Sequence, residues 1–139
     1  MSTETVWSKA DIDCFLKQAD SYQSRLVVKA ERLTATKTWL TANGSDLTAQ
    51  PGDWIVSDGI TSWTVAAYVF DATYVAIGDG RFRKAVVVTA RQLQHRATVA
   101  TIEGPARAGV GDWLVCNPGG EVWPVTATEF ARRYERLAA

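Results

Sequence analysis

The chain has 139 residues, with 15 basic and 15 acidic side chains and 47% hydrophobic residues. A net charge of zero argues against nucleic-acid binding, because proteins that hold phosphates carry an excess of Lys and Arg. No apolar run approaches the ~18 residues that a membrane-spanning helix needs, and the N-terminus lacks the features of a signal peptide. We therefore expect a single globular, cytoplasmic domain over residues 1–139, with neither nucleic acid nor membrane as a partner.

The first predicted element is a helix over residues 8–20, within an N-terminal segment that ends at residue 21. Ser8 and Asp11 have the spacing of a capping box. Trp7 precedes the cap and Ile12 follows it at the spacing of a hydrophobic staple. This helix is expected to cover one surface or one end of a sheet.

The rest of the chain is an internal duplication, in which residues 22–74 and 82–134 are two copies of one module. With their flanking residues, the copies extend over 22–77 and 82–139 and are joined by a linker at 78–81. The matched segments are Val27–Leu33 with Val87–Leu93, Gly52–Val56 with Gly111–Val115, and Trp63–Val65 with Trp123–Val125. A module of about 55 residues is marginally stable alone, so the two copies are expected to share one core.

Each copy is expected to contain about four short strands and a closing helix. In the first copy the strands are expected at 25–33, 37–42, 54–57 and 62–65, and the helix at 66–74. In the second copy they are expected at 84–93, 97–102, 113–116 and 121–125, with a helix from Thr126 that carries Phe130, Tyr134 and Leu137 on one face. Turn residues separate these elements, including 43–46 and the Gly78-Asp79-Gly80 linker. The pattern predicts an α+β fold of mainly antiparallel strands with a pseudo-twofold axis, arranged as a curled sheet or a partly open barrel.

Several motifs of the second copy occur in the order typical of one group of small bacterial and phage proteins. They are Phe82-Arg83-Lys84, the valine run 86–88, Gly111-Asp112-Trp113, Trp123-Pro124-Val125 and Phe130-Ala131-Arg132-Arg133-Tyr134-Glu135. The chain thus resembles the PGDYG family, named for its Pro-Gly-Asp-aromatic motif, and the first copy keeps Pro51-Gly52-Asp53-Trp54 in full. Ala85 and Val110 stand where the family has Pro. The resemblance implies a phage or mobile-element protein and no particular activity.

Six Trp residues are a high content for this length, and four of them are equivalent in pairs: Trp54 with Trp113, and Trp63 with Trp123. Two aromatic walls that face each other could hold a flat or apolar ligand. The alternative is that all four fill a core. These four residues are the first candidates for ligand binding.

Glu31 and Arg91 are equivalent in the two copies and are the other candidates, as ligand contacts or as a salt bridge between neighbouring strands. Asp53 and Asp112 recur after Gly, which indicates that they bond to turn backbone, with a pair of functional carboxylates as the alternative. His95, the only histidine, lacks an obvious partner for general-base catalysis.

No catalytic residue can be assigned, and no metal site or cofactor is expected, because the chain has one His, two distant Cys and no phosphate-binding loop. The leading interpretation is a non-catalytic module that binds a small molecule or a protein partner between the copies. A small cofactor-free isomerase, cyclase or hydrolase that uses a cavity there is the first alternative. A structural oligomeric subunit, such as a homodimer formed through strand edges, is the second.

Overall fold

The computed structural model of the protein describes residues 5–41 and 44–137. Within these ranges the chain forms an α+β fold of mainly antiparallel strands, as the sequence predicts. The helices are α1 (Lys9–Leu16), α2 (Ala67–Thr73) and α3 (Ala127–Arg133). The strands are β1 (Val6–Trp7), β2 (Asp20–Ser24), β3 (Val27–Arg32), β4 (Lys37–Leu40), β5 (Asp46–Ala49), β6 (Trp54–Ser57), β7 (Ser62–Val65), β8 (Tyr74–Gly78), β9 (Arg81–Lys84), β10 (Val88–Gln92), β11 (Ala97–Thr101), β12 (Gly104–Ala108), β13 (Trp113–Cys116), β14 (Val122–Val125) and β15 (Tyr134–Arg136).

Two five-stranded sheets make up most of the fold, and each contains strands from both copies. Their orders are β7-β6-β3-β9-β8 and β14-β13-β10-β2-β15, so strands at equivalent sequence positions occupy equivalent places. β2 opens the first copy, yet it pairs with β10 and β15 of the second. β9 opens the second copy and pairs with β3 and β8 of the first. Because the copies exchange their leading strands, neither sheet is complete without the other copy.

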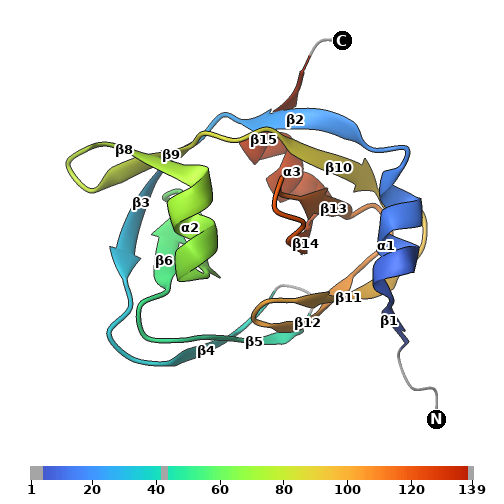
Figure 1. Ribbon diagram of the computed structural model, residues 1–139, viewed down its shortest axis with the longest axis horizontal. Coiled ribbons are helices and arrows are strands. Elements are labelled where there is room, and N and C mark those ends of the chain that lie inside the picture. The colour runs from blue at the N-terminus through green and yellow to red at the C-terminus, as the bar shows by residue number, and fades with distance from the viewer. Residues whose placement is uncertain (1–4, 42–43, 138–139) are drawn as a thin grey trace.

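Two smaller sheets, β1-β11-β12 and β4-β5, complete the strand pairing of the described residues. The backbone N–H of Thr48 in β5 donates to the carbonyl of Glu103, beside β12, at 3.0 Å, which joins the two copies again. Figure 1 shows β4, β5, β11 and β12 along one side of the molecule and β2, β10 and β15 along the other, with α2 and α3 between them in this view. Of these elements, β4, β5, β11, β12, α2 and α3 contribute residues to the candidate site.

The strands are divided among four sheets within the described ranges, and none of these sheets closes on itself. The curled sheet or partly open barrel that the repeat pattern suggests stays a prediction. The expected linker, residues 78–81, is instead part of the β8–β9 hairpin, whose turn is Asp79-Gly80 and where Asp79 has a φ of 56°. The junction between the copies therefore lies inside a sheet, and the hairpin projects from the rest of the chain (Figure 1). The pseudo-twofold axis stays a prediction.

The closing helix of the second copy is shorter than its periodicity predicts. Thr126 caps α3, as expected, by accepting a hydrogen bond at 3.3 Å from the backbone N–H of Glu129. The helix ends at Arg133, and Tyr134 begins β15, which pairs with β2. The edge strand β2 offers hydrogen-bond partners to the backbone of residues 134–136. Helical periodicity is read from the local sequence alone and therefore gives no sign of this distant strand. The turn expected at 43–46 lies partly outside the described residues.

α1 begins as the sequence predicts, but it ends at Leu16 and not at residue 20, and Asp20 already belongs to β2. Ser8 Oγ accepts from the backbone N–H of Asp11 at 3.1 Å, and Asp11 Oδ2 accepts from the backbone N–H of Ser8 at 3.0 Å, which completes the capping box. Ile12 is buried against Val99 and Leu114, and Trp7 packs against the same cluster. The helix thus covers the side of the second copy.

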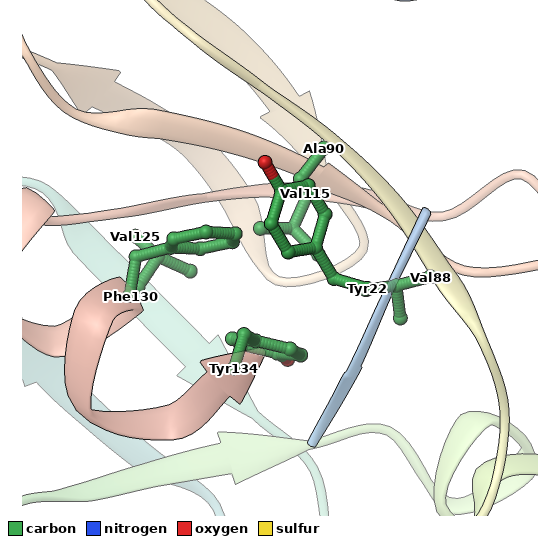
Figure 2. Packing of buried hydrophobic residues seen from close by; sticks show 7 residues of the cluster. All are labelled: Tyr22, Val88, Ala90, Val115, Val125, Phe130 and Tyr134. Atoms are coloured by element: carbon green, nitrogen blue, oxygen red, sulfur yellow. The ribbon is translucent and has the colours of Figure 1, made fainter. Parts of the chain in front are cut away.

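Each large sheet has an aromatic core of the same composition. In the second, the ring of Phe130 stacks on Trp113 at 4.0 Å between centroids and on Tyr134 at 5.1 Å. Figure 2 shows Phe130 and Tyr134 facing Tyr22 and the valines of β10, β13 and β14. The first sheet repeats this packing, with Phe70 stacked on Trp54 at 4.1 Å and on Tyr74 at 4.8 Å. Trp54, Phe70 and Tyr74 in the first copy and Trp113, Phe130 and Tyr134 in the second thus form matching stacks in the two cores.

Candidate functional site

A cavity of about 490 Å³ lies between the two copies and is partly open to solvent. Its walls are mainly apolar and come from both copies. The equivalent strands β7 and β14 supply the central stretch of the lining, from Ser62 to Ala66 and from Val122 to Thr126. A volume of this size suits a small organic molecule, because ligand sites commonly have ~300–1,000 Å³.

Trp63 and Trp123 both line the cavity, and each carries a cation on one ring face. The guanidinium carbon of Arg133 lies 4.0 Å from the ring centroid of Trp63. The Nζ of Lys84 lies 4.2 Å from the ring centroid of Trp123. Since a ring face attracts a cation, these contacts hold both indoles in place.

Lys84 is the most unusual residue of the cavity, because its side chain is buried without an ion pair among the described residues. Only 7% of the residue is exposed, and Nζ donates one hydrogen bond, at 3.4 Å, to Tyr134 Oη. Burial, reinforced by the positive charge of Arg133 and opposed by Glu121, lowers the pKa of Lys84 to about 7. Desolvation has this effect because it penalises the charged form of an amine. A large share of Lys84 is therefore the neutral amine near neutral pH.

Glu103 is a second ionisable group of the lining with a perturbed pKa. Its Oε2 accepts a hydrogen bond from Thr64 Oγ1, and that hydroxyl accepts another, at 2.7 Å, from Trp39 Nε1. Burial raises the pKa of Glu103 to about 7; the bond from Thr64 opposes the rise and the charge of Asp53 adds to it. The cavity thus contains an acid and a base that both titrate near neutral pH, which is common at functional sites and also occurs in structural networks.

Replacement of Glu103 with Gln is expected to stabilise the protein at pH 8 by about 2 kcal/mol and to have little effect at pH 4.5. The folded protein holds a proton on this carboxyl that the unfolded chain loses above its ordinary pKa of 4.5. Wild-type stability therefore falls as the pH rises from 4.5 to 7, and the amide removes this loss. Urea unfolding at pH 4.5, 6 and 8 measures the difference in free energy of unfolding between the wild type and Glu103→Gln. Glu31→Gln, at an exposed carboxylate, is the control, and an equal gain there would contradict the assignment.

An ion cluster joins the β6–β7 turn of the first copy to α3 of the second. Asp58, whose side chain is fully buried, binds Arg132 at 2.6 Å and lies 3.5 Å from Arg133. Glu129 also binds Arg133, at 3.0 Å, and Thr61 Oγ1 accepts from Arg133 at 2.8 Å. Burial alone would raise the pKa of Asp58, but bonds from the backbone N–H groups of Thr61 and Ile60 and from Arg132 outweigh it and lower the pKa to about 2.

The four predicted Trp residues divide into two pairs. Trp63 and Trp123 line the cavity as the sequence suggests. Trp54 and Trp113 are not among its lining residues and instead stack on Phe70 and Phe130 in the cores. The sequence treats the two pairs alike, and only the tertiary structure shows that one pair lines the cavity and the other does not.

Glu31 and Arg91 lie in different sheets and do not line the cavity. Glu31 is exposed on β3 opposite Ile55. Arg91 donates to the backbone carbonyl of Phe15 at 2.9 Å, and its guanidinium lies 4.4 Å from the Phe15 ring centroid. Arg91 thus fixes α1 to the sheet, and the proposed salt bridge between Glu31 and Arg91 is absent.

Asp53 and Asp112 both bond to turn backbone, as their position after Gly indicates. Asp53 Oδ2 accepts from the N–H of Gln50 at 2.8 Å, and its Oδ1 accepts from the N–H of Ala67, the first residue of α2, at 2.9 Å. Asp112 Oδ2 accepts from the N–H of Gly109 at 2.8 Å.

His95 is exposed and borders a separate depression of about 170 Å³.

Sequence reasoning missed Lys84 and Glu103 as site residues. Lys84 carried a usable signal, since it shares strand parity with Phe82, and alternate residues of a strand face the same side. A lysine on the inward face of a strand is unusual because the ammonium must be desolvated. Glu103 follows a strand in a Glu-Gly turn, which is normally a solvent-exposed position, so no local pattern indicated its burial.

The fold and the cavity define the class: an α+β protein of mainly antiparallel strands whose two interleaved copies enclose a mainly apolar cavity. Comparison with protein-family models, with curated proteins and with solved structures gave no match for the chain. The resemblance to the PGDYG family accordingly stays a prediction. Across the described ranges, no helix is long and apolar enough to cross a membrane. In those ranges no group of three or more His, Cys, Asp or Glu residues is placed to hold a metal ion.

Proposed function

We propose that the protein binds a small, flat, largely apolar molecule in the cavity between its two copies. The observation that carries this proposal is the open cavity of about 490 Å³ with Trp63 and Trp123 in its lining. Aromatic rings give such a ligand a large contact area and lose little conformational freedom on binding. The polar groups of the lining, above all Lys84 and Glu103, would orient the polar end of the ligand.

The cations on the two Trp rings support this proposal. Arg133 and Lys84 each occupy one ring face, so the indoles are held before any ligand arrives. A site that is already ordered avoids the entropic cost of ordering side chains on binding. Asp58, in the β6–β7 turn of the first copy, lies 3.5 Å from Arg133 of the second copy and helps to keep that guanidinium over the Trp63 ring.

Replacement of Trp63 or Trp123 with Leu is expected to weaken the binding of 2-naphthalenemethanol by about tenfold or more, which corresponds to ~1.4 kcal/mol of lost aromatic contact. Titration calorimetry on the folded variants measures this effect. Trp113→Phe is the matched control, because Trp113 stacks in the core and is absent from the cavity lining. Equal weakening in all three variants, or no binding to the wild type at any attainable concentration, would contradict the proposal.

A small cofactor-free enzyme is the second candidate, and one observation favours it. The pKa values of Lys84 and Glu103 both lie near 7 and both groups line the same cavity. A general acid or base works best when its pKa is near the working pH. Under this candidate, Glu103→Gln removes turnover of a substrate while leaving its binding within a few fold; under the binding candidate, the wild type turns over no compound that it binds.

A further inference from the structure

Lys84 combines burial with a place in the cavity lining, the setting of a nucleophilic amine. Structural lysines in protein interiors are normally paired with a carboxylate, and Lys84 has no ion pair among the described residues. Its single hydrogen bond goes to the phenol oxygen of Tyr134, which cannot neutralise an ammonium. The Nζ lies over the ring of Trp123 and the residue belongs to the cavity lining. Lys84 therefore belongs to the wall against which the proposed ligand would lie.

We propose that the Lys84 amine forms an imine with an aldehyde or ketone group of the ligand held in this cavity. The proposal rests on the binding function proposed above and names the class of ligand: a flat apolar body that carries a reactive carbonyl. Imine formation by lysine is a recognised form of covalent catalysis in desolvated pockets.

The step needs no reagent beyond the carbonyl compound. The lone pair of Nζ attacks the carbonyl carbon, a C–N bond forms, and the carbonyl oxygen takes one of the amine hydrogens to give a carbinolamine. The C–O bond then breaks, and the oxygen leaves as water with the second amine hydrogen. The product is an imine between Lys84 and the ligand, with one water released and no change of oxidation state.

The surroundings of Lys84 suit each stage. The attacking form is the neutral amine, and burial lowers the pKa of Lys84 to about 7, so this form is abundant at neutral pH. The bond to Tyr134 fixes Nζ without blocking the cavity side, because Tyr134 itself is not part of the lining. Asn117, another lining residue, is 4% exposed, and its side-chain oxygen has no hydrogen-bond partner among the described residues. Such an acceptor could be satisfied by a polar group of the ligand.

The other four lysines of the chain provide an internal comparison. They are Lys9, Lys17, Lys29 and Lys37, and all are exposed. These side chains share the chemistry of Lys84 but not its burial in the cavity. Selective reaction at Lys84 would therefore reflect its position in the cavity.

Reductive trapping tests the proposal on the intact chain. The protein is incubated at pH 7 with 2-naphthaldehyde and sodium cyanoborohydride, which reduces an imine to a stable secondary amine, and the adduct is located by peptide mass spectrometry. We expect one naphthylmethyl group at Lys84, formed at least about tenfold faster than at any exposed lysine. Excess 2-naphthalenemethanol, which has the same ring and no carbonyl, should slow labelling of Lys84 and leave Lys9 unaffected.

The outcomes separate the two proposals. If 2-naphthalenemethanol binds but labelling is even across the five lysines, the imine proposal is overturned and the binding function stands. If 2-naphthoate binds far more tightly than both neutral probes and no adduct forms, Lys84 is the ion-pair partner of an acid and the imine proposal again fails. If none of the three probes binds, the binding function itself is contradicted. Because labelling is mapped on the wild type, the test does not depend on a Lys84 variant that folds.

Discussion

Replacement of Asp58 with Ala is expected to lower the free energy of unfolding by about 4 kcal/mol, the largest loss that we predict for a single polar residue. The buried carboxylate binds Arg132 at 2.6 Å, and Oδ1 accepts from the backbone N–H groups of Ile60 and Thr61 at 2.9 and 2.8 Å. Alanine would leave two arginines without their buried partner and the turn without its acceptor. Urea unfolding at pH 7 measures the loss.

Asp58→Asn tests the ion pairs of this residue separately from its hydrogen bonds to the turn backbone. Asparagine keeps an acceptor for the two turn N–H groups and removes only the ion pairs, so we expect a loss of about 2 kcal/mol at pH 7. The pKa of Asp58 is lowered from 3.8 to about 2; the carboxylate therefore stabilises the fold above pH 3.8, and this contribution is lost as the pH falls towards 2. The difference between wild type and Asp58→Asn should fall to a small fraction of its pH 7 value by pH 2. A difference that persists there in full would show that the asparagine disturbs the turn and would contradict the assignment.

Replacement of Lys84 with Met is expected to have the opposite effect and to raise the free energy of unfolding by about 2 kcal/mol at pH 7. The pKa of Lys84 falls from 10.5 unfolded to about 7 folded, so folding at pH 7 works against protonation of this amine. Met fills the same volume without a charge, at the cost of the contact with the Trp123 ring. The same variant cannot form the imine, so stability would be gained as the proposed function is lost, a trade-off common at functional sites.

The pH dependence gives the Lys84 prediction its own check. A lysine with a lowered folded pKa makes wild-type stability rise with pH, from about 7 to 10.5, because the unfolded chain holds the proton longer. The advantage of Lys84→Met should therefore shrink steadily over this interval in urea unfolding. Lys29→Met, at an exposed position on β3, is the matched control and should change stability by no more than ~0.5 kcal/mol at any pH. A destabilised Lys84→Met protein at pH 7 would mean that the ammonium is well solvated or paired.

The duplication made much of the local structure predictable. Equivalent strands, the cap of α1, the cap of α3 and the turn role of Asp53 all follow from residue types at fixed spacing. Local patterns were less informative where a strand's partner comes from far along the chain. The sequence analysis predicts no strand for β5 or β12 and a helix for the residues of β15, because the pairing of these strands depends on a neighbour that a short window does not contain.

The candidate site could be predicted only in part for the same reason. The sequence by itself determined that Trp63 and Trp123 are equivalent, that each copy is too small to stand alone, and that Asp53 belongs to a turn. Only the tertiary structure decided that Trp63 and Trp123 face a cavity while Trp54 and Trp113 fill cores, and that Lys84 is buried without an ion pair. Burial and desolvation depend on which distant segments pack around a residue. The exchange of β2 and β9 between the copies sets that packing, and no local pattern of residues encodes it.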